Sequence, residues 1–256
     1  MTQVSNTAFS ARSVLASALL GADPPELPVA HLVRLAGLFG INENRARVAL
    51  SRMAAQGEAA TDGKGNYRLA GHLLFRQARQ AASRAGVTGR WSGSWHLVVV
   101  TTSGSTAEVR AKRRKALSFA RLEEVREGVW MRPDNLALSL ADELSADVEV
   151  MSARPSTPAK LASGLWPLEE WAERAEVLIA DLEDLEPTGV DDLAPGFALS
   201  AAVLRHLQAD PLLPDELLRS NWPGDRLRRI YDAWDADYRS VLTEWGRRAR
   251  RAPTSP

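Results

Sequence analysis

Residues 41–71 read INENRARVALSRMAAQGEAATDGKGNYRLAG, and their periodicity changes halfway along. The first half has apolar residues at helical spacing, which predicts a helix from Glu43 to Gln56 with one core-facing stripe. Asn42 stands where an N-cap is expected, and Gly57 stands where the helix would end. The opposite face is polar and basic, so either water or a binding partner must account for it. The core-facing residues are Ala46, Ala49, Leu50 and Met53.

A hairpin is predicted directly after this helix. EAA (58–60) and YRLA (67–70) have the composition of short strands, and the intervening TDGKGN is dense in turn residues. Before the quoted stretch, VAHLVRLAGLF (29–39) predicts another helix, which Gly40 would end. Helix, tight turn, helix and hairpin together predict a winged helix-turn-helix, in which the second helix enters the major groove of DNA and the hairpin lies along the backbone.

This arrangement gives candidate DNA contacts on the polar helix face and on the hairpin. Asn and Arg side chains make bidentate contacts with adenine and guanine edges, whereas Ser and Val are short enough not to block the approach. Lys64 and Arg68 on the hairpin are expected to meet phosphates, which positions a domain without reading sequence. For the helix taken alone, a solvated basic face is the alternative interpretation. The candidate DNA-binding residues are Asn42, Asn44, Arg45, Arg47, Val48, Ser51, Arg52, Lys64, Asn66 and Arg68.

Charge is unevenly distributed along the chain, although the formal net charge is zero. Residues 1–90 carry 11 Lys and Arg against 5 Asp and Glu, a net of +6, whereas residues 161–256 carry 11 against 18, a net of −7. Segregation of this size is typical of a polyanion-binding head joined to an acidic body. The gradient alone does not distinguish nucleic acid from an acidic protein partner.

The composition is that of a globular chain. With 256 residues, 45% of them hydrophobic and 25% charged, it excludes bulk disorder and allows two or three domains. The absence of cysteine excludes disulfides, zinc-thiolate sites and thiol nucleophiles, and it suits a reducing compartment. The apolar stretch SVLASALLGA (13–22) lacks the charged flank of a signal peptide, and no run is long enough to span a bilayer. The sequence therefore predicts a soluble cytoplasmic protein.

The middle of the chain alternates strand and helix patterns, which predicts a small α/β sandwich. Strands are expected at WHLVVVTT (95–102), VREGVWM (125–131) and DVEVM (147–151). Helices are expected at 105–120 and at NLALSLADEL (135–144). The residues predicted for the apolar face of the first helix are Val109, Arg113, Ala116 and Phe119.

From Trp166 onward the pattern is that of acidic, amphipathic helices. Such a body is a poor DNA surface and a reasonable dimerisation or effector module. The tail GRRARRAPTSP (246–256) is expected to fray.

In the middle of the chain, a basic run leaves three interpretations open: a second nucleic-acid contact, a clamp for coenzyme A phosphates, or a solvated helix face. This run is Arg110, Lys112, Arg113, Arg114 and Lys115.

Several longer segments carry a resemblance to a known family. These are ARSVLASALLG, GINENRARVALSRMAAQG, RWSGSWHLVVV, RAKRRKALSFARLEEVREGVWMRPDNL and DPLLPDELLRSNWPGDRLRRIYDAW, in this order. The chain resembles the PaaX family of phenylacetate-degradation repressors over most of its length, with GVWMRPDNL and LLRSNWPG as the most distinctive segments. Three residues of the predicted recognition helix, Asn44, Arg45 and Ala46, depart from the family pattern. The operator sequence of the family is therefore not carried over to this chain.

The resemblance implies a fold and a function. It implies that the central part has the ferredoxin-like fold of small CRISPR-associated nucleases. It also implies a homodimeric repressor of an aromatic-acid catabolic operon, which binds double-stranded operator DNA and is released by an aryl-acyl-CoA, phenylacetyl-CoA in the type members. We therefore expect an α+β multidomain chain with a winged helix-turn-helix at 1–88, a ferredoxin-like α/β domain at 89–155 and a helical C-terminal effector or dimerisation domain at 156–256.

Enzymatic alternatives find little support in the residues. A metal-dependent nuclease would need an acidic ligand at the end of its first strand, but VVVTTSGS has no carboxylate before Glu108. The chain has no G-x-S-x-G, P-loop or paired-carboxylate motif, and its four histidines lack ligand spacing. The sequence thus predicts no catalytic residue, no metal site and no cofactor. A nuclease and a protein-interaction module remain the alternatives to a DNA-binding regulator. The histidines are His31, His72, His96 and His206.

Overall fold

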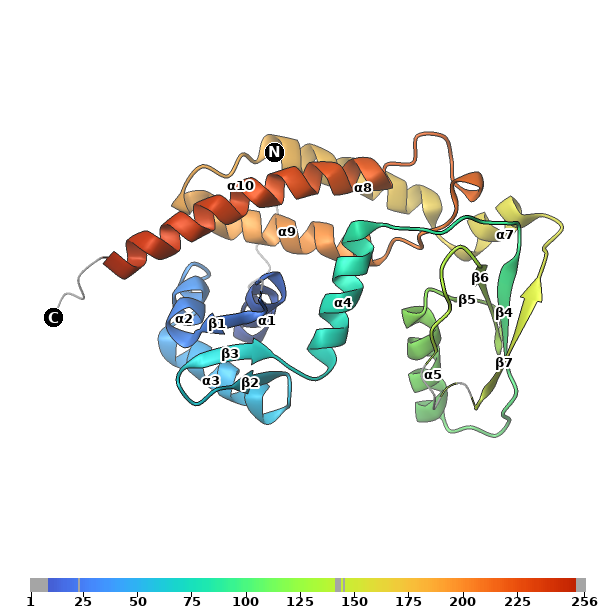
Figure 1. The fold of residues 1–256 in the computed structure, drawn as a ribbon, viewed down its shortest axis with the longest axis horizontal. Coiled ribbons are helices and arrows are strands. Elements are labelled where there is room, and N and C mark those ends of the chain that lie inside the picture. Colours follow the sequence, from blue (N-terminus) through green and yellow to red (C-terminus); the bar gives the residue numbers. More distant parts are fainter. Residues whose placement is uncertain (1–8, 23, 141–143, 145, 252–256) are drawn as a thin grey trace. The chain divides into compact units, whose positions relative to one another are not determined.

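The computed structural model describes residues 9–22, 24–140, 144 and 146–251 of the chain (Figure 1). They form a mixed helix and sheet protein with two small antiparallel sheets. Over the described residues the chain divides into two compact units, each assembled from separate segments. The first unit combines Met1–Ala85, Val177–Gln208 and Arg226–Pro256, and the second combines Gly86–Glu176 and Ala209–Asp225. The three-domain division expected from the sequence stays a prediction.

The N-terminal part of the first unit, which we call the head, consists of helices and a three-stranded sheet (Figure 1). Its helices pack on one buried apolar cluster that includes Leu15, Leu32 and Leu50, each of which is fully buried. The sheet has the order β1-β3-β2 with antiparallel pairing throughout. The elements of the head are α1 (Ala11–Gly21), β1 (Glu26–Pro28), α2 (Val29–Gly37), α3 (Glu43–Ala55), β2 (Ala59–Thr61) and β3 (Asn66–Leu69).

Local signals explain most of these boundaries. The Asn42 side chain caps α3 by accepting a hydrogen bond from the Arg45 N–H at 2.9 Å. Gly57 ends the helix with a φ of 69°, a left-handed conformation that favours glycine. Strand β1 was not predicted, because Glu26–Pro28 lies in the proline-rich DPPELP and its partner β3 is about 40 residues away along the chain.

Long helices complete the first unit. α4 (His72–Ala85) follows the hairpin, and α9 (Leu193–Gln208) packs against it. α10 (Gly224–Arg251) approaches α9 closely at Gly196, where an added Cβ would lie 2.6 Å from Tyr238 Cε2. The tail was predicted to fray from Gly246, but this was wrong for residues 246–251, because α10 continues to Arg251. Residues 252–256 lie outside the described residues. α8 (Leu168–Asp184) contributes residues to both units.

The second unit contains a four-stranded antiparallel sheet in the order β5-β6-β4-β7. One face packs around Trp95, which is fully buried, and the other around Val98 and Leu117. The 3₁₀ turns of the chain are η1 (Val190–Asp192), in the first unit, and η2 (Asp215–Leu217), in the second. The remaining elements of the second unit are β4 (Trp95–Val100), α5 (Ala107–Phe119), β5 (Glu123–Arg126), β6 (Val129–Pro133), β7 (Val148–Ala153) and α7 (Pro158–Leu165).

Two secondary-structure predictions for this unit are corrected. The single strand expected at 125–131 is a hairpin, because Gly128 adopts a φ of 74° and turns β5 back as β6. The helix expected at 135–144 is absent from 135–140, and most of its remainder lies outside the described residues.

The predicted apolar face of α5 was wrong at Val109 and Phe119 but right at Arg113. Val109 and Phe119 are 43% and 48% exposed, whereas Arg113 and Leu117 are buried. Arg113 turns inward because its guanidinium pairs with Asp147 at 2.7 Å and donates to the Thr102 hydroxyl at 2.8 Å.

Candidate nucleic-acid interface

Helix α3 has the two faces that its sequence predicts. Ala46, Leu50 and Met53 are fully buried against the head. The other side is open to solvent, and the residues that are exposed there are Asn44, Arg45, Arg47, Val48, Ser51 and Arg52. α3 therefore presents a polar face with three guanidinium groups, flanked by the hairpin that follows it.

Arg47 lies on this face in an exposed ion pair. Its Nε is 2.7 Å from Glu43 Oε1, one helical turn earlier, and the two side chains are 52% and 63% exposed. An exposed pair of this kind contributes only about 0.3–0.5 kcal/mol, so a phosphate or a guanine edge can compete for the guanidinium. Glu43 therefore pairs with Arg47 without holding it strongly.

The hairpin tip is tied together by one carboxylate. Asp62 Oδ1 accepts hydrogen bonds from the backbone N–H groups of Lys64 at 2.7 Å and Asn66 at 3.0 Å. Asp62 Oδ2 accepts a further hydrogen bond from the Asn66 side-chain amide at 2.8 Å. The backbone and side-chain hydrogen bonds from Asn66, with that from Lys64, hold the pKa of Asp62 below its usual value. The ionised carboxylate thus fixes the turn, and Lys64 and Arg68 remain exposed beside it.

Two of the candidate contacts already have structural roles. The Asn42 side-chain oxygen caps α3, and the Asn66 amide is bound to Asp62. These two side chains stabilise α3 and the hairpin turn, while the other eight candidates are exposed to solvent.

A buried carboxylate, which sequence reasoning missed, fastens the base of the hairpin to α1. Glu58 is 6% exposed, and its Oε2 accepts a hydrogen bond from Arg12 Nε at 2.8 Å. Arg12 Nη2 also contacts Oε1, and His72 Nε2 lies 3.8 Å from the same oxygen. The hydrogen bond from Arg12 is the main reason that the pKa of Glu58 lies below its usual value. The sequence showed Glu58 only as the start of a short strand, and its partner is 46 residues away.

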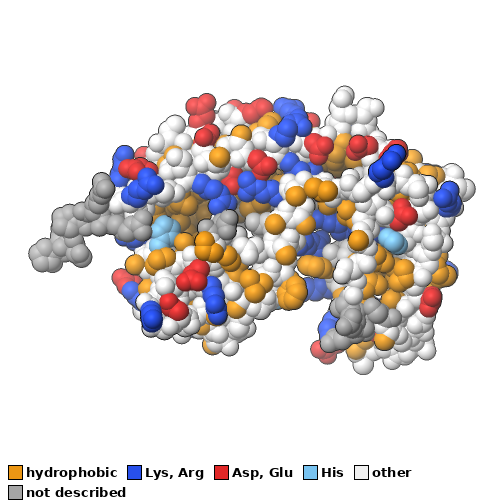
Figure 2. Space-filling view, viewed as in Figure 1, with side chains coloured by type: hydrophobic (Ala, Val, Ile, Leu, Met, Phe, Trp, Pro, Cys, Tyr) orange, Lys and Arg blue, Asp and Glu red, His pale blue; other side chains and the backbone are white. Residues whose placement is uncertain are grey.

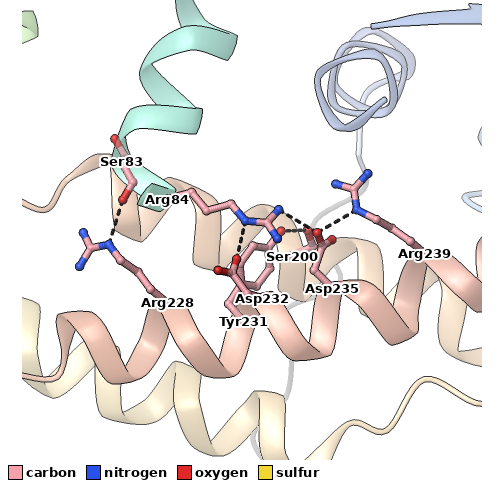
Figure 3. A network of polar contacts seen from close by, with 8 residues as sticks. All are labelled: Ser83, Arg84, Ser200, Arg228, Tyr231, Asp232, Asp235 and Arg239. Atoms are coloured by element: carbon pink, nitrogen blue, oxygen red, sulfur yellow. Dashed lines mark hydrogen bonds and ion pairs between the residues drawn. The ribbon is translucent and has the colours of Figure 1, made fainter. Parts of the chain in front are cut away.

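A polar network joins α4 to α10 (Figure 3). Asp235 is 4% exposed and accepts hydrogen bonds from Arg84 and Arg239, each at 2.8 Å. Arg84 also pairs with Asp232 at 2.5 Å and lies over the Tyr231 ring, 4.9 Å from its centroid. Burial alone would lower the pKa of Arg84, but its hydrogen bonds with Asp235 and Asp232 raise it. These contacts attach the helix that follows the hairpin to the C-terminal helix.

The same network reaches α9. Tyr231, which is fully buried, shares a 2.8 Å hydrogen bond with the Ser200 hydroxyl. Burial, followed by the charge of Asp235, raises the pKa of Tyr231 well above its usual value, so the phenol stays neutral. Arg228 adds a 3.0 Å hydrogen bond to the Ser83 carbonyl at the end of α4.

The basic run on α5 does not form one open surface. Arg113 is buried in its contact with Asp147, and Arg114 pairs with Glu124 on β5. Arg110 donates to the Ser105 carbonyl at 2.6 Å. Because these three guanidinium groups already have partners nearby in the chain or the sheet, the run does not offer them together to a phosphate. The interpretation as a solvated helix face therefore fits better than a phosphate clamp.

Clusters of metal-ligating side chains and membrane-spanning helices would mark other classes of protein. No cluster of three or more potential metal-ligating side chains occurs among the described residues. The helices within the described ranges include none with both the length and the apolar character needed to cross a membrane.

Comparisons with known proteins agree with these features. Residues 10–73 match the family described as PaaX-like protein, and residues 88–163 match the PaaX protein central Cas2-like domain. The uncharacterized protein Rv0674 from Mycobacterium tuberculosis has a similar solved structure, with 41% sequence identity and a TM-score of 0.72 over 92% of this chain and 98% of that one. No curated protein matches the chain. The chain thus belongs to the PaaX family of transcriptional regulators.

Proposed function

We propose that this protein regulates transcription by binding duplex DNA through a winged helix-turn-helix. The observation that carries the proposal is the exposed face of α3, which bears Arg45, Arg47 and Arg52 beside a hairpin that bears Lys64 and Arg68. A helix fits the major groove, which is about 12 Å wide, and its arginines can pair with guanine edges there. The hairpin then follows the adjacent phosphates as the wing.

The proposal extends to the remainder of the chain. We assign the sheet of the second unit to a ferredoxin-like domain, and its order β5-β6-β4-β7 with α5 as the first crossover supports this assignment. The match to the PaaX central Cas2-like domain supports it further. The helical C-terminal part serves dimerisation and effector response in this proposal.

As a regulator, the protein acts as a homodimeric repressor of an aromatic-acid catabolic operon. Two-fold symmetry of the dimer requires an operator with two inverted half-sites. Release follows when an aryl-acyl-CoA such as phenylacetyl-CoA favours a geometry whose heads no longer match the half-site spacing. Family membership supports this part of the proposal.

Selection of bound duplexes from a random DNA library tests the proposal. We expect the full chain to enrich an inverted repeat, and a mobility shift with that repeat to strengthen as salt is lowered. If no sequence is enriched and the affinity does not depend on salt, the DNA-binding assignment fails and a protein-interaction module becomes the better account.

A wing variant sharpens this test. Lys64→Ala should weaken every duplex alike and reduce the slope of log affinity against log salt by about 0.9, because one phosphate contact is lost. Arg126→Ala, which removes an exposed arginine from β5, is the matched control and should leave the slope unchanged. An unchanged slope for Lys64→Ala contradicts the placement of the wing on the backbone.

A further inference from the structure

The first unit contains a cavity of about 760 Å³ whose walls come from widely separated parts of its sequence. Most of the lining residues come from α1, β1 and α2 of the head and from α9 and α10, and α4 contributes two more. Figure 2 shows hydrophobic side chains in the hollow between the head and α10, with Lys and Arg side chains along the α10 edge. A cavity of this size lies within the range of about 300–1,000 Å³ that small-molecule sites occupy.

Small side chains on facing helices keep this space open. Ser17 and Ala18 of α1 stand on one wall, and Ser200 and Ala201 of α9 stand on another. A well-packed core would fill such a space with large side chains, since protein interiors are packed about as densely as organic crystals. Larger apolar groups, including Phe9, also line the space, and the Phe9 ring packs against the Phe197 ring at 6.2 Å.

The charges on the walls are mainly positive. Four arginines line the cavity against two carboxylates, Glu26 and Asp235, which leaves a net charge of +2. Asp235 is already shared by Arg239 and Arg84, so it does not offset the other guanidinium groups. For Arg205 the structure records no hydrogen-bond or ion-pair partner among the residues that it describes, and its side chain is exposed. The four arginines are Arg34, Arg76, Arg205 and Arg239.

We propose that this cavity binds an amphipathic organic anion, with its apolar body between α1 and α9 and its acidic group against Arg205. Apolar walls with a few convergent charged groups are the chemistry that recognises such a molecule. Charge-assisted hydrogen bonds from guanidinium groups are the strong contacts with carboxylate, sulfonate or phosphate oxygens. The ligand class thus follows from the lining residues themselves.

Strand β1 links the cavity to the hairpin. All three of its residues line the cavity, and each pairs with a residue of β3: Glu26 with Arg68, Leu27 with Tyr67, and Pro28 with Asn66. The Val29 N–H also donates to the Gly65 carbonyl at 2.7 Å. A ligand that moves β1 therefore moves the strand that carries Arg68. This coupling rests on the proposed DNA-binding function, whereas ligand binding does not.

Titration of the full chain without DNA tests the site. The probes are anilinonaphthalenesulfonate, phenylacetate, coenzyme A and phenylacetyl-CoA, which separate carboxylate from phosphate recognition and the free acid from its thioester. We expect at least one probe to bind saturably, and Arg205→Ala to weaken it about tenfold through the lost charge-assisted contact. Arg229→Ala, an exposed arginine of α10 outside the cavity, is the matched control and should bind as the wild type does.

A second variant keeps the test independent of Arg205. Ala201→Trp fills the cavity from α9 and should abolish probe binding while the thermal unfolding midpoint stays near that of the wild type. The proposed site is wrong if no probe binds, or if a probe binds the wild type and both cavity variants with equal affinity. A probe that binds in the cavity should also change the affinity for the selected DNA in the wild type and not in Ala201→Trp.

The two proposals fail in different ways. If the protein binds no DNA but the probe titrations behave as expected, the DNA-binding function is wrong and the cavity site stands. If DNA binds and a probe occupies the cavity without changing the DNA affinity, the coupling through β1 is wrong.

Discussion

Arg47 is the side chain that we expect to contribute most directly to base recognition in the proposed DNA complex. Its side chain is 52% exposed, and its Nε pairs with the solvent-exposed Glu43 one helical turn earlier. We expect Arg47→Ala to weaken binding to the selected operator by about 1–3 kcal/mol and to relax base preference at one position in each half-site. Quantitative mobility shifts against single-base variants of the operator measure both effects. An unchanged affinity and preference would mean that α3 does not read the groove with this face.

Glu58 gives the head a pH-dependent stability of predictable sign. Its pKa is lower in the folded state than its usual value of 4.5, so the folded state binds fewer protons than the unfolded state. The contribution of Glu58 is therefore complete above the unfolded pKa, and it is lost as pH falls through the folded pKa, from about pH 5 downward. Glu58→Gln should lower the urea midpoint at pH 7. It should also make the fall in the urea midpoint between pH 5 and pH 3 smaller than in the wild type.

The matched control for this prediction is Glu186→Gln, which changes an exposed carboxylate in the first unit. Its urea midpoints should follow those of the wild type at each pH. If the urea midpoint of Glu58→Gln fell as steeply with decreasing pH as that of the wild type, another carboxylate would be responsible for the loss of stability in acid.

Several residues could be assigned from sequence because their roles are local. Asn42, Gly57 and the buried stripe of α3 act within a few positions of themselves, so spacing is enough to identify them. Glu58 and Asp235 could not be assigned, because their partners Arg12 and Arg84 are 46 and 151 residues away. The cavity was missed for the same reason, since its walls meet only after the chain has folded.

At the scale of elements, the contact between α9 and α10 depends on a residue without a side chain. A Cβ on Gly196 would lie 2.6 Å from Cε2 of Tyr238, and this ring cannot move away easily. Tyr238 is 5% exposed, stacks on Trp234 at 5.1 Å and donates its hydroxyl to the Leu193 carbonyl at 2.8 Å. The helix pair is therefore sensitive to a single methyl group.

We expect Gly196→Ala to destabilise the protein by about 1–3 kcal/mol, because the added methyl group overpacks this contact. The control is Gly37→Ala, at the end of α2, where a Cβ would have nothing within 4 Å. That change should leave stability unchanged or raise it by up to about 1 kcal/mol, since Ala is favoured over Gly in helices. Urea unfolding of the two variants checks the prediction, and equal midpoints would contradict it.

Secondary-structure elements with a strong period were predicted well, and those set by distant partners were not. α3, α8, α9 and β4 follow from their apolar spacing. β1 did not follow, because a Glu-Leu-Pro strand exists only through its pairing with β3. On α5 the predicted face includes Arg113, which is buried, but also Val109 and Phe119, which are exposed, so spacing alone misplaced the two ends of that face.

At the scale of the molecule, the head shares its core with the C-terminal helices. Phe197 of α9 and Leu242 and Trp245 of α10 pack against the apolar cluster of the head. We expect a fragment comprising residues 1–88 to be less stable than the head within the full chain, because these contacts would be lost. Hydrogen exchange at the amides of Leu15 and Leu32 measures the difference. Equal protection in the fragment and in the full chain would show that the head folds independently.

The tip of the hairpin is held in a different way from its strands. β3 is paired on both sides, to β1 and to β2, whereas Asp62 closes the turn by hydrogen bonds made within the turn itself. Substitutions at the exposed Lys64 can therefore accumulate without disturbing the strands. In the proposed complex, substitutions at the tip therefore change the phosphate contacts while β1, which lines the cavity, keeps its pairing with β3.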